Sequence, residues 1–120
     1  MTPAQDYDAI VAAIQHYIDG ARTGGSAEMK KAFHDQATIF GYIGPDLFAG
    51  PIQGLYDWHD SNGAAADVAI RVVSVNQAES VATARLEIDN WTGHRFTDMF
   101  ALLKVGGEWK VMCKVFHLHG

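Results

Sequence analysis

A late hairpin of this sequence carries an aspartate and a lysine that could act together in acid–base or ligand-binding chemistry. Segments 94–105 and 108–119 have the composition of antiparallel strands, and a three-residue loop between them would set Asp98 opposite Lys114. A shift of one residue would leave both charges without a partner. The favoured register therefore places this pair among aromatic side chains on one face of a sheet.

The protonation state of Asp98 then depends on where Lys114 points. If Lys114 lies opposite, the carboxylate stays ionised and accepts hydrogen bonds. If Lys114 points away and the site is dry, burial raises the pKa of Asp98 and the protonated carboxyl can donate. We favour the ion pair, which makes these two residues a structural or ligand-orienting pair.

The six histidines raise the possibilities of a general base and of a metal site. His34 and Asp35 could form an acid–base dyad if His34 turns inward; the alternative is a solvent-facing turn. His117 and His119 share one face of a strand, but no third ligand accompanies them, so no metal site is predicted. Cys113 is interpreted as a packed thiol rather than a nucleophile.

The elements that must position these residues begin with helices. Apolar residues spaced by three and four predict a helix over 4–21, with Thr2 as its N-cap. Ser26 is a capping residue for a short second helix that ends near Phe33. Segment 37–43 is β-branched and aromatic and predicts a strand, and a third helix is expected over 51–59.

The pattern changes period after residue 63 and indicates four antiparallel strands joined by short turns. Their expected ranges are 67–77, 81–91, 94–105 and 108–119. Three helices in the first half and a long sheet in the second predict an α+β fold, with the helices covering one face of a mostly antiparallel sheet.

Composition limits the function classes. The chain has 120 residues, 48% of them hydrophobic, and a net charge of -5, which predicts one domain over 1–120. The acidic balance argues against nucleic acid and anionic membranes, and no apolar run reaches the ~18 residues that a membrane span needs. The single cysteine excludes an internal disulfide, so a cytoplasmic location is expected. No cofactor is predicted.

Three late motifs carry a resemblance to a known family. They are Phe-Thr-Asp-Met-Phe-Ala-Leu-Leu-Lys at 96–104, Gly-Glu-Trp-Lys-Val at 107–111 and Lys-Val-Phe-His at 114–117. With the order of elements, they make nearly the whole chain similar to the nuclear transport factor 2 (NTF2)-like superfamily, and within it to small bacterial proteins called lumazine-binding-like or SnoaL-like. The resemblance implies a cone in which a strongly curved sheet wraps the first helix. It also implies a cavity at the open end and a homodimer through the other sheet face.

A curved sheet with helices on its concave side leaves a hollow where the core ends, and ligands bind in such hollows. The lining is expected to be aromatic, with Asp98 and Lys114 as its polar members, although each ring could instead only pack in the core. The aromatic candidates are Tyr17, Phe33, Phe40, Tyr42, Trp58, Trp91, Phe96, Phe100 and Phe116.

The resemblance extends in part to the ketosteroid isomerases. In those enzymes a tyrosine late in the first helix and a protonated aspartate on a late strand donate hydrogen bonds to the substrate oxyanion, and here Tyr17 and Asp98 match those two places. The aspartate that serves as their general base is replaced by Gly41, and glycine cannot take a proton. The candidate catalytic residues are therefore Asp98, Tyr17 and His34.

Three hypotheses of different classes follow. The first is a domain that binds a small organic ligand in an aromatic-lined pocket without catalysis. The second is an enzyme of the ketosteroid isomerase, polyketide cyclase or dehydratase type that uses an acid–base residue in the same pocket. The third is a protein-interaction adaptor, which would need an exposed apolar patch that the sequence does not clearly contain. A homodimer is expected in each case.

Overall fold

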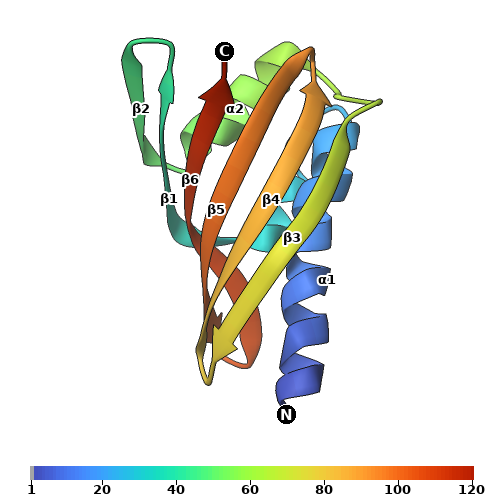
Figure 1. Ribbon diagram of the computed structural model, residues 1–120, viewed down its shortest axis with the longest axis vertical. Helices are drawn as coiled ribbons and strands as arrows, with labels where there is room; N and C mark the ends of the chain where they lie inside the picture. Colours follow the sequence, from blue (N-terminus) through green and yellow to red (C-terminus); the bar gives the residue numbers. More distant parts are fainter. Residues whose placement is uncertain (1) are drawn as a thin grey trace.

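A computed structural model describes residues 2–120 and has one curved sheet backed by helices. The elements are α1 (Pro3–Arg22), the 3-10 helix η1 (Met29–Ala32), β1 (Phe33–Ile43), β2 (Asp46–Pro51), α2 (Gln53–Asn62), β3 (Ala69–Ala78), β4 (Val81–Trp91), β5 (His94–Val105) and β6 (Glu108–His119). The strand order is β2-β1-β6-β5-β4-β3, with β1 parallel to β6 and the other neighbours antiparallel. Both α-helices lie behind the sheet (Figure 1). The predicted α+β class is confirmed.

The prediction of three α-helices is wrong, since two are present in residues 2–120. The segment after Ser26 forms only the four-residue η1, and β1 already begins at Phe33. Ser26 does not cap it, because the N-cap residue is Glu28, which makes no side-chain capping hydrogen bond, and the Ser26 hydroxyl donates to Asp60. Such a short segment cannot offset the cost of starting an α-helix. It is held instead by close packing, because a Cβ at Gly20 of α1 would lie 2.5 Å from the Cβ of Met29.

Strand β2 was not expected from the sequence. The predicted break after Ile43 is a tight turn with Gly44 at φ 59°, and the chain returns as β2 along β1. Pro51, expected in a helix, is the last residue of β2, and α2 begins two residues later. Glycine and proline are turn signals that hid this edge strand, where a missing N–H is tolerated.

Helix α1 crosses the inner face of the sheet with its predicted apolar stripe buried. Thr2 caps the helix by accepting a hydrogen bond from the N–H of Gln5, as expected for an N-cap threonine. Asp6 accepts hydrogen bonds from Lys104 Nζ at 2.9 Å and Trp109 Nε1 at 3.0 Å, and these bonds lower the pKa of its carboxyl. The first turn of α1 is thereby tied to the β5–β6 hairpin. Neither α-helix in residues 2–120 is both long and apolar enough to cross a membrane.

The predicted four-strand meander is present, but the register of its last hairpin differs from the expectation. The loop is the two-residue turn 106–107, in which both glycines have positive φ as this turn type requires, so Val105 pairs with Glu108. A bulge farther along then shifts the register by one. Asp98 consequently lies opposite Phe116 rather than opposite Lys114, and the two charged residues are diagonal neighbours on the inner face.

Candidate functional site

A cavity of about 100 Å³ opens between α2 and the inner face of the curved sheet. Its wall is almost wholly apolar and comes from both helix and strands. The lining residues are Ile39, Ile43, Phe48, Leu55, Trp58, Trp91, His94, Phe96, Lys114, Phe116 and Leu118. The titratable side chains among them are Lys114 and His94.

The alternation of β1 decides which of its residues reach this cavity. Ile39 and Ile43 point inward and line it, whereas Phe40 and Tyr42 point to the other face and are 40% and 61% exposed. Successive side chains of a strand face opposite sides, so all four cannot share one face. Phe40 and Tyr42, expected among the lining aromatics, thus lie outside the cavity.

Gly41 lies on the inward face of β1 and is covered by an aromatic ring. A Cβ at this position would come within 2.5 Å of the ring of Phe116, which itself lines the cavity. The ring therefore occupies the space into which the side chain of an isomerase's general base would project. The packing of Phe116 over position 41 therefore leaves no room for a carboxylate side chain.

Trp91 reaches the cavity because of a local irregularity in β4. Counting by alternation from the buried Ile88 would turn Trp91 outward, but the β4–β5 register shifts between these two residues. Asn90 and Thr92 have φ values of 61° and 49°, and a β-branched residue with positive φ is a strained conformation. The strained turn aims the indole inward, where it is 2% exposed.

The floor of the cavity is a chain of three polar side chains from α1, β5 and β6. Lys114 Nζ donates to the hydroxyl oxygen of Tyr17 at 2.9 Å, and that hydroxyl donates to Asp98 Oδ2 at 2.7 Å. The lysine nitrogen also lies 3.7 Å from the same carboxylate oxygen. Tyr17 and Asp98 are 0% exposed and Lys114 is 5% exposed, and of the three only Lys114 touches the cavity.

Burial dominates the electrostatics of this chain. It raises the pKa of the Asp98 carboxyl, and the nearby Lys114 and the Tyr17 hydrogen bond offset that rise only in part. Burial lowers the pKa of the Lys114 ammonium, although Asp98 opposes the change. Burial, followed by the charge of Asp98, raises the pKa of the Tyr17 hydroxyl well above its usual value. Both members of the ion pair are therefore pushed toward their neutral forms.

Aromatic rings enclose the lysine nitrogen. Its distances to the ring centroids of Tyr17, Trp91 and Phe116 are 5.0, 5.5 and 5.6 Å, within the range of cation–π attraction. The rings stabilise a positive charge at this point and exclude water from it. Any other positively charged group at the position of this nitrogen would be surrounded by the same rings.

Three buried polar atoms around this floor have no hydrogen-bond partner in the described part of the chain. They are Asp98 Oδ1, Trp91 Nε1 and His59 Nδ1. His59 Nε2 lies 2.9 Å from the carbonyl oxygen of Thr23 and must donate to it, which leaves Nδ1 as an acceptor. The His59 ring packs edge-on against Trp91. Unpartnered polar atoms are costly to bury, and they cluster where a ligand would be recognised.

The expected site residues thus fall into groups. Trp58, Trp91, Phe96, Lys114 and Phe116 lie on the cavity wall, with Tyr17 and Asp98 directly below Lys114. Phe33 and Phe100 pack against Tyr17 in the core, with ring centroids 5.8 and 5.2 Å away. His34 lies outside the cavity, and its Nδ1 accepts a hydrogen bond from the N–H of Gln36 at 3.0 Å.

Several wall residues were not identified from the sequence: Ile39, Ile43, Phe48, Leu55, His94 and Leu118. The alternation of inward residues on β1 and β6 could have indicated Ile39 and Leu118. Phe48 could not be found, because its strand was not expected.

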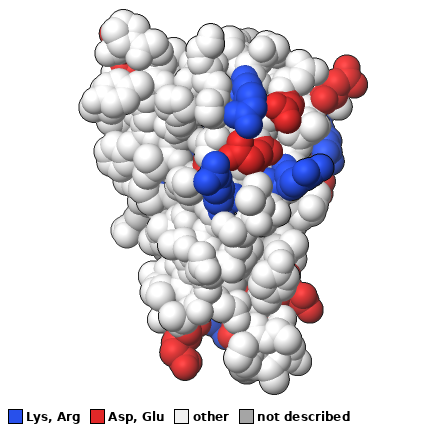
Figure 2. Space-filling view, viewed as in Figure 1, with Lys and Arg blue, Asp and Glu red and all other residues white. Residues whose placement is uncertain are grey.

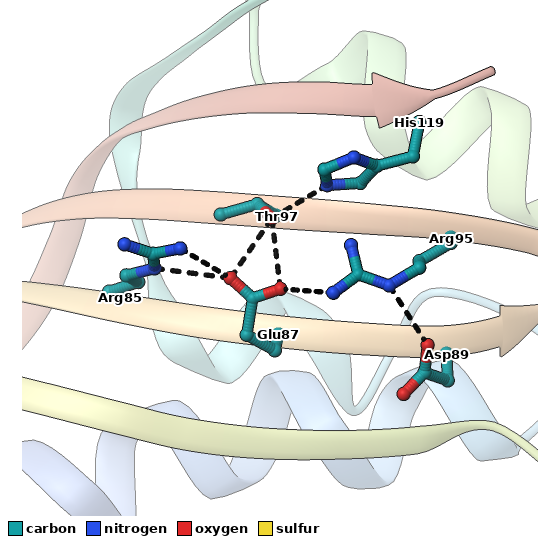
Figure 3. Close-up of polar contacts among 6 residues, drawn as sticks. All are labelled: Arg85, Glu87, Asp89, Arg95, Thr97 and His119. Carbon is teal, nitrogen blue, oxygen red and sulfur yellow. Dashed lines mark hydrogen bonds and ion pairs between the residues drawn. The ribbon is translucent and has the colours of Figure 1, made fainter.

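A second polar cluster lies on the outer face of the same sheet, where Figure 2 shows basic and acidic side chains gathered together. Figure 3 shows its centre, Glu87 of β4, which accepts hydrogen bonds from Arg85, Arg95 and Thr97 at 2.9 to 3.1 Å. Partial burial raises the pKa of Glu87, but Thr97 and the two arginines together outweigh it and leave the pKa below its ordinary value. This outer cluster is the group Arg85, Glu87, Asp89, Arg95, Thr97 and His119.

The paired histidines at the end of β6 belong to this outer face. The rings of His117 and His119 are 4.6 Å apart, and His119 Nε2 lies 2.8 Å from the Thr97 hydroxyl. Within residues 2–120, no three His, Cys, Asp or Glu side chains are arranged to hold a metal ion.

Comparisons with known proteins agree with this geometry. Residues 5–117 match the family described as "Putative lumazine-binding". An NTF2-like protein of unknown function from Methylobacillus flagellatus KT is 47% identical, with a TM-score of 0.96 over 99% of this chain and 96% of that one. A second, from Shewanella baltica OS155, is 38% identical, with a TM-score of 0.94 over 100% and 98% of the two chains. Aldolase FrzH from Cladobotryum sp is 25% identical over 115 residues, which cover 95% of this chain and 92% of the aldolase.

Proposed function

This chain belongs to the "Putative lumazine-binding" family of the NTF2-like superfamily, and we propose that it binds a small, flat, carbonyl-bearing organic molecule in the cavity beside α2. The wall supplies flat apolar surface from Trp58, Trp91, Phe96 and Phe116. Such a wall recognises a ligand by its shape and its lack of charge, and a few polar groups then fix its orientation.

The observation that carries the proposal is the position of Lys114. Its nitrogen is a hydrogen-bond donor on a wall whose only other titratable side chain is His94, and it lies at the floor rather than at the rim. A carbonyl oxygen that enters the cavity would accept a hydrogen bond from this nitrogen and restore part of the hydration that burial removed. The family description, with its reference to lumazine, points to the same chemistry: a flat ring system with carbonyl oxygens.

The size of the cavity limits the ligand. A volume of about 100 Å³ is below the roughly 300 Å³ at which drug-sized pockets begin. One or two fused rings would fill the space between Trp58 and Phe116. Any larger substituent must extend past Ile43, which lies at the wall and is 42% exposed.

Calorimetric titration with lumazine tests the proposal. We expect saturable binding to the wild-type protein and a marked loss with Leu118→Trp, which fills the cavity from β6. His117→Trp is the matched control, since it adds the same ring on the opposite face of the same strand. If the affinity for lumazine is the same in all three proteins, binding does not occur in this cavity.

A second candidate function is an enzyme of the ketosteroid isomerase, polyketide cyclase or dehydratase type. The observation in its favour is the buried 2.7 Å hydrogen bond between Tyr17 and Asp98, which would hold both groups ready for proton transfer. That a relative is an aldolase is consistent with carbonyl chemistry. His34 is not available for this role from its place outside the cavity, so the candidate acid–base groups reduce to Tyr17, Asp98 and Lys114.

We further propose that the protein acts in the cytoplasm as a homodimer joined through the outer face of the sheet. That face carries Met99 and Val115 as directly paired neighbours, both 47% exposed, beside the outer cluster. A two-fold interface would cover these side chains with their own copies.

A further inference from the structure

We infer that Lys114 is a nucleophilic amine that captures the carbonyl group of a bound aldehyde or ketone as an imine. The inference rests on the proposed function, because the carbonyl compound must first enter the cavity. It goes beyond that function by assigning a covalent reaction to a residue that would otherwise only donate a hydrogen bond.

The position of the nitrogen is the first argument. Lys114 is the only one of the five lysines in the chain that contacts the cavity. Its polar contacts, Tyr17 at 2.9 Å and Asp98 at 3.7 Å, come from below the floor, on α1 and β5. The side toward the cavity is bordered by aromatic rings, which leave the nitrogen open to a carbonyl carbon approaching from that side.

The hydrogen-bonded chain is the second argument, because it provides a route for removing the proton that makes the amine unreactive. Lys114 can pass a proton to the Tyr17 oxygen across 2.9 Å while Tyr17 passes its own proton to Asp98 across 2.7 Å. The products are a neutral amine and a neutral carboxylic acid, and the phenol is unchanged. Burial favours this direction, since it lowers the pKa of Lys114 and raises that of Asp98.

The covalent step then balances without any further reactant. The lone pair of the Lys114 nitrogen attacks the carbonyl carbon, a C–N bond forms, and the oxygen takes the proton from Asp98 by way of Tyr17. The nitrogen next loses a proton to the same chain and uses its lone pair to form C=N. The C–O bond breaks as Asp98 gives up that proton again by way of Tyr17, and the hydroxyl group leaves as water, with the protonated imine beside an ionised Asp98. One carbonyl group and one amine thus become one imine and one water.

The environment of the nitrogen suits the product as well as the reactant. A protonated imine has the same single positive charge as the ammonium that it replaces. Asp98 and the rings of Tyr17, Trp91 and Phe116 would therefore keep a cation in place. The apolar wall keeps water away from the C=N bond and slows its hydrolysis.

The other lysines provide an internal control. Lys104 is paired with Asp6 at 2.9 Å, and Lys31 lies 3.1 Å from Glu28. Lys110 donates to the carbonyl oxygen of Lys31, and Lys30 Nζ lies 5.3 Å from the ring centroid of Tyr56. None of them lines the cavity. They should react only as lysines outside the cavity do, without the proton route that Tyr17 and Asp98 provide.

Reductive trapping with benzaldehyde and cyanoborohydride at pH 7, followed by peptide mapping, tests the inference. We expect Lys114 to gain a benzyl group at least about tenfold faster than any other lysine, because burial lowers the pKa of its ammonium and the hydrogen-bonded chain removes its proton. Equal labelling of all five lysines, or labelling that spares Lys114, would overturn the inference. The comparison is made within one folded protein and does not depend on any variant.

Two variants refine the test. Tyr17→Phe keeps the ring but removes the proton route, so labelling at Lys114 should slow while labelling at Lys110 is unchanged. Lys114→Arg keeps a cation but has no nucleophilic amine, so preferential labelling should disappear. Unchanged labelling of Lys114 in Tyr17→Phe would show that the proton route plays no part and would overturn the mechanism.

The outcome also separates this inference from the proposed function. If lumazine binds in the cavity and benzaldehyde does not label Lys114 preferentially, the covalent role falls and the binding function stands. If neither lumazine nor benzaldehyde engages the cavity, both fall.

Discussion

Two polar clusters lie back to back on the two faces of one sheet, and they differ mainly in their access to water. The inner chain is Lys114, Tyr17 and Asp98; the outer cluster is centred on Glu87, one strand away. Asp98 is 0% exposed, whereas the arginine side chains that pair with Glu87 are 49% and 47% exposed. Each cluster joins a carboxylate to basic and hydroxyl groups, so composition alone does not separate them.

This difference in access to water shifts the pKa values of the two carboxyl groups in opposite directions. The outer cluster stabilises an ionised Glu87 and lowers its pKa, whereas burial raises the pKa of Asp98 despite its lysine partner. An ion pair that is exposed to water contributes little to the free energy of unfolding, and its members keep their charges. A pair out of water is driven toward proton exchange, and this difference supports our proposals of chemistry on the inner face and of assembly on the outer one.

The largest expected effect comes from removing one carboxylate from each cluster. Asp98→Ala leaves a buried lysine without its counter-charge and should cost about 3–5 kcal/mol of unfolding free energy. Glu87→Ala leaves exposed arginines that water can solvate, so its cost should be far smaller. Urea denaturation of both variants measures the difference. Equal losses would show that burial does not distinguish the clusters.

Position 41 offers the next largest effect. Gly41→Asp forces a Cβ into the ring of Phe116 and should cost about 1–3 kcal/mol while reducing the affinity for lumazine. Tyr42→Asp is the matched control, because it puts the same side chain on the exposed face of the same strand. Thermal melts and titrations of both variants check this expectation. A stable Gly41→Asp protein with full affinity would contradict the packing of Phe116 over Gly41.

The two clusters should also give opposite pH dependences. Above the ordinary pKa of 3.8, unfolded Asp98 has lost the proton that folded Asp98 still holds, so this residue makes stability fall as pH rises from about 3.8. Glu87 has a lowered pKa when folded, so its stabilisation is lost as pH falls below its ordinary 4.5.

Unfolding free energies measured between pH 3 and pH 7 test both signs. Relative to wild type, Asp98→Asn should gain stability as pH rises, and the deficit of Glu87→Gln should shrink as pH falls. As pH rises, the two variants should thus diverge from wild type in opposite directions, Asp98→Asn becoming relatively more stable and Glu87→Gln relatively less stable. Parallel curves for both variants would mean that the two carboxyl groups have similar environments.

The smallest effect on the folded chain is expected on the outer face. Met99→Asp places a charge at the centre of the proposed dimer surface but touches nothing in the cavity. Sedimentation should change from a two-chain to a one-chain species, while the circular dichroism spectrum stays the same. A wild-type protein that already sediments as one chain would remove the dimer from the account.

The fold was predictable from the sequence where one pattern dominated. The apolar stripe of α1 and the turn residues between β3, β4, β5 and β6 indicated those elements correctly. Strand β2 was not predictable, because Gly50 and Pro51 are turn signals and its extended conformation is supported by tertiary contacts, namely pairing with β1 and packing of Phe48 on Phe116. The short η1 shows the same dependence on tertiary packing, here against Gly20.

The site residues could be predicted where successive side chains of a strand alternate between the two faces of the sheet. This alternation placed Asp98 and Lys114 on one inner face despite an incorrect loop length, because the loop error and the later bulge together shift the register by two residues. Alternation failed at Trp91, whose orientation depends on the bulge at Asn90. The contact of Tyr17 with Asp98 joins residues 81 positions apart, and only a resemblance to known folds suggested it.

The central claim is that the cavity holds a carbonyl-bearing molecule against Lys114. A crystal structure of the protein grown with lumazine tests it most directly. We expect the flat ring to lie between Trp58 and Phe116, with one carbonyl oxygen roughly 3 Å from Lys114 Nζ. A ligand bound on the outer face, or in the cavity with its oxygens turned away from this nitrogen, would contradict it.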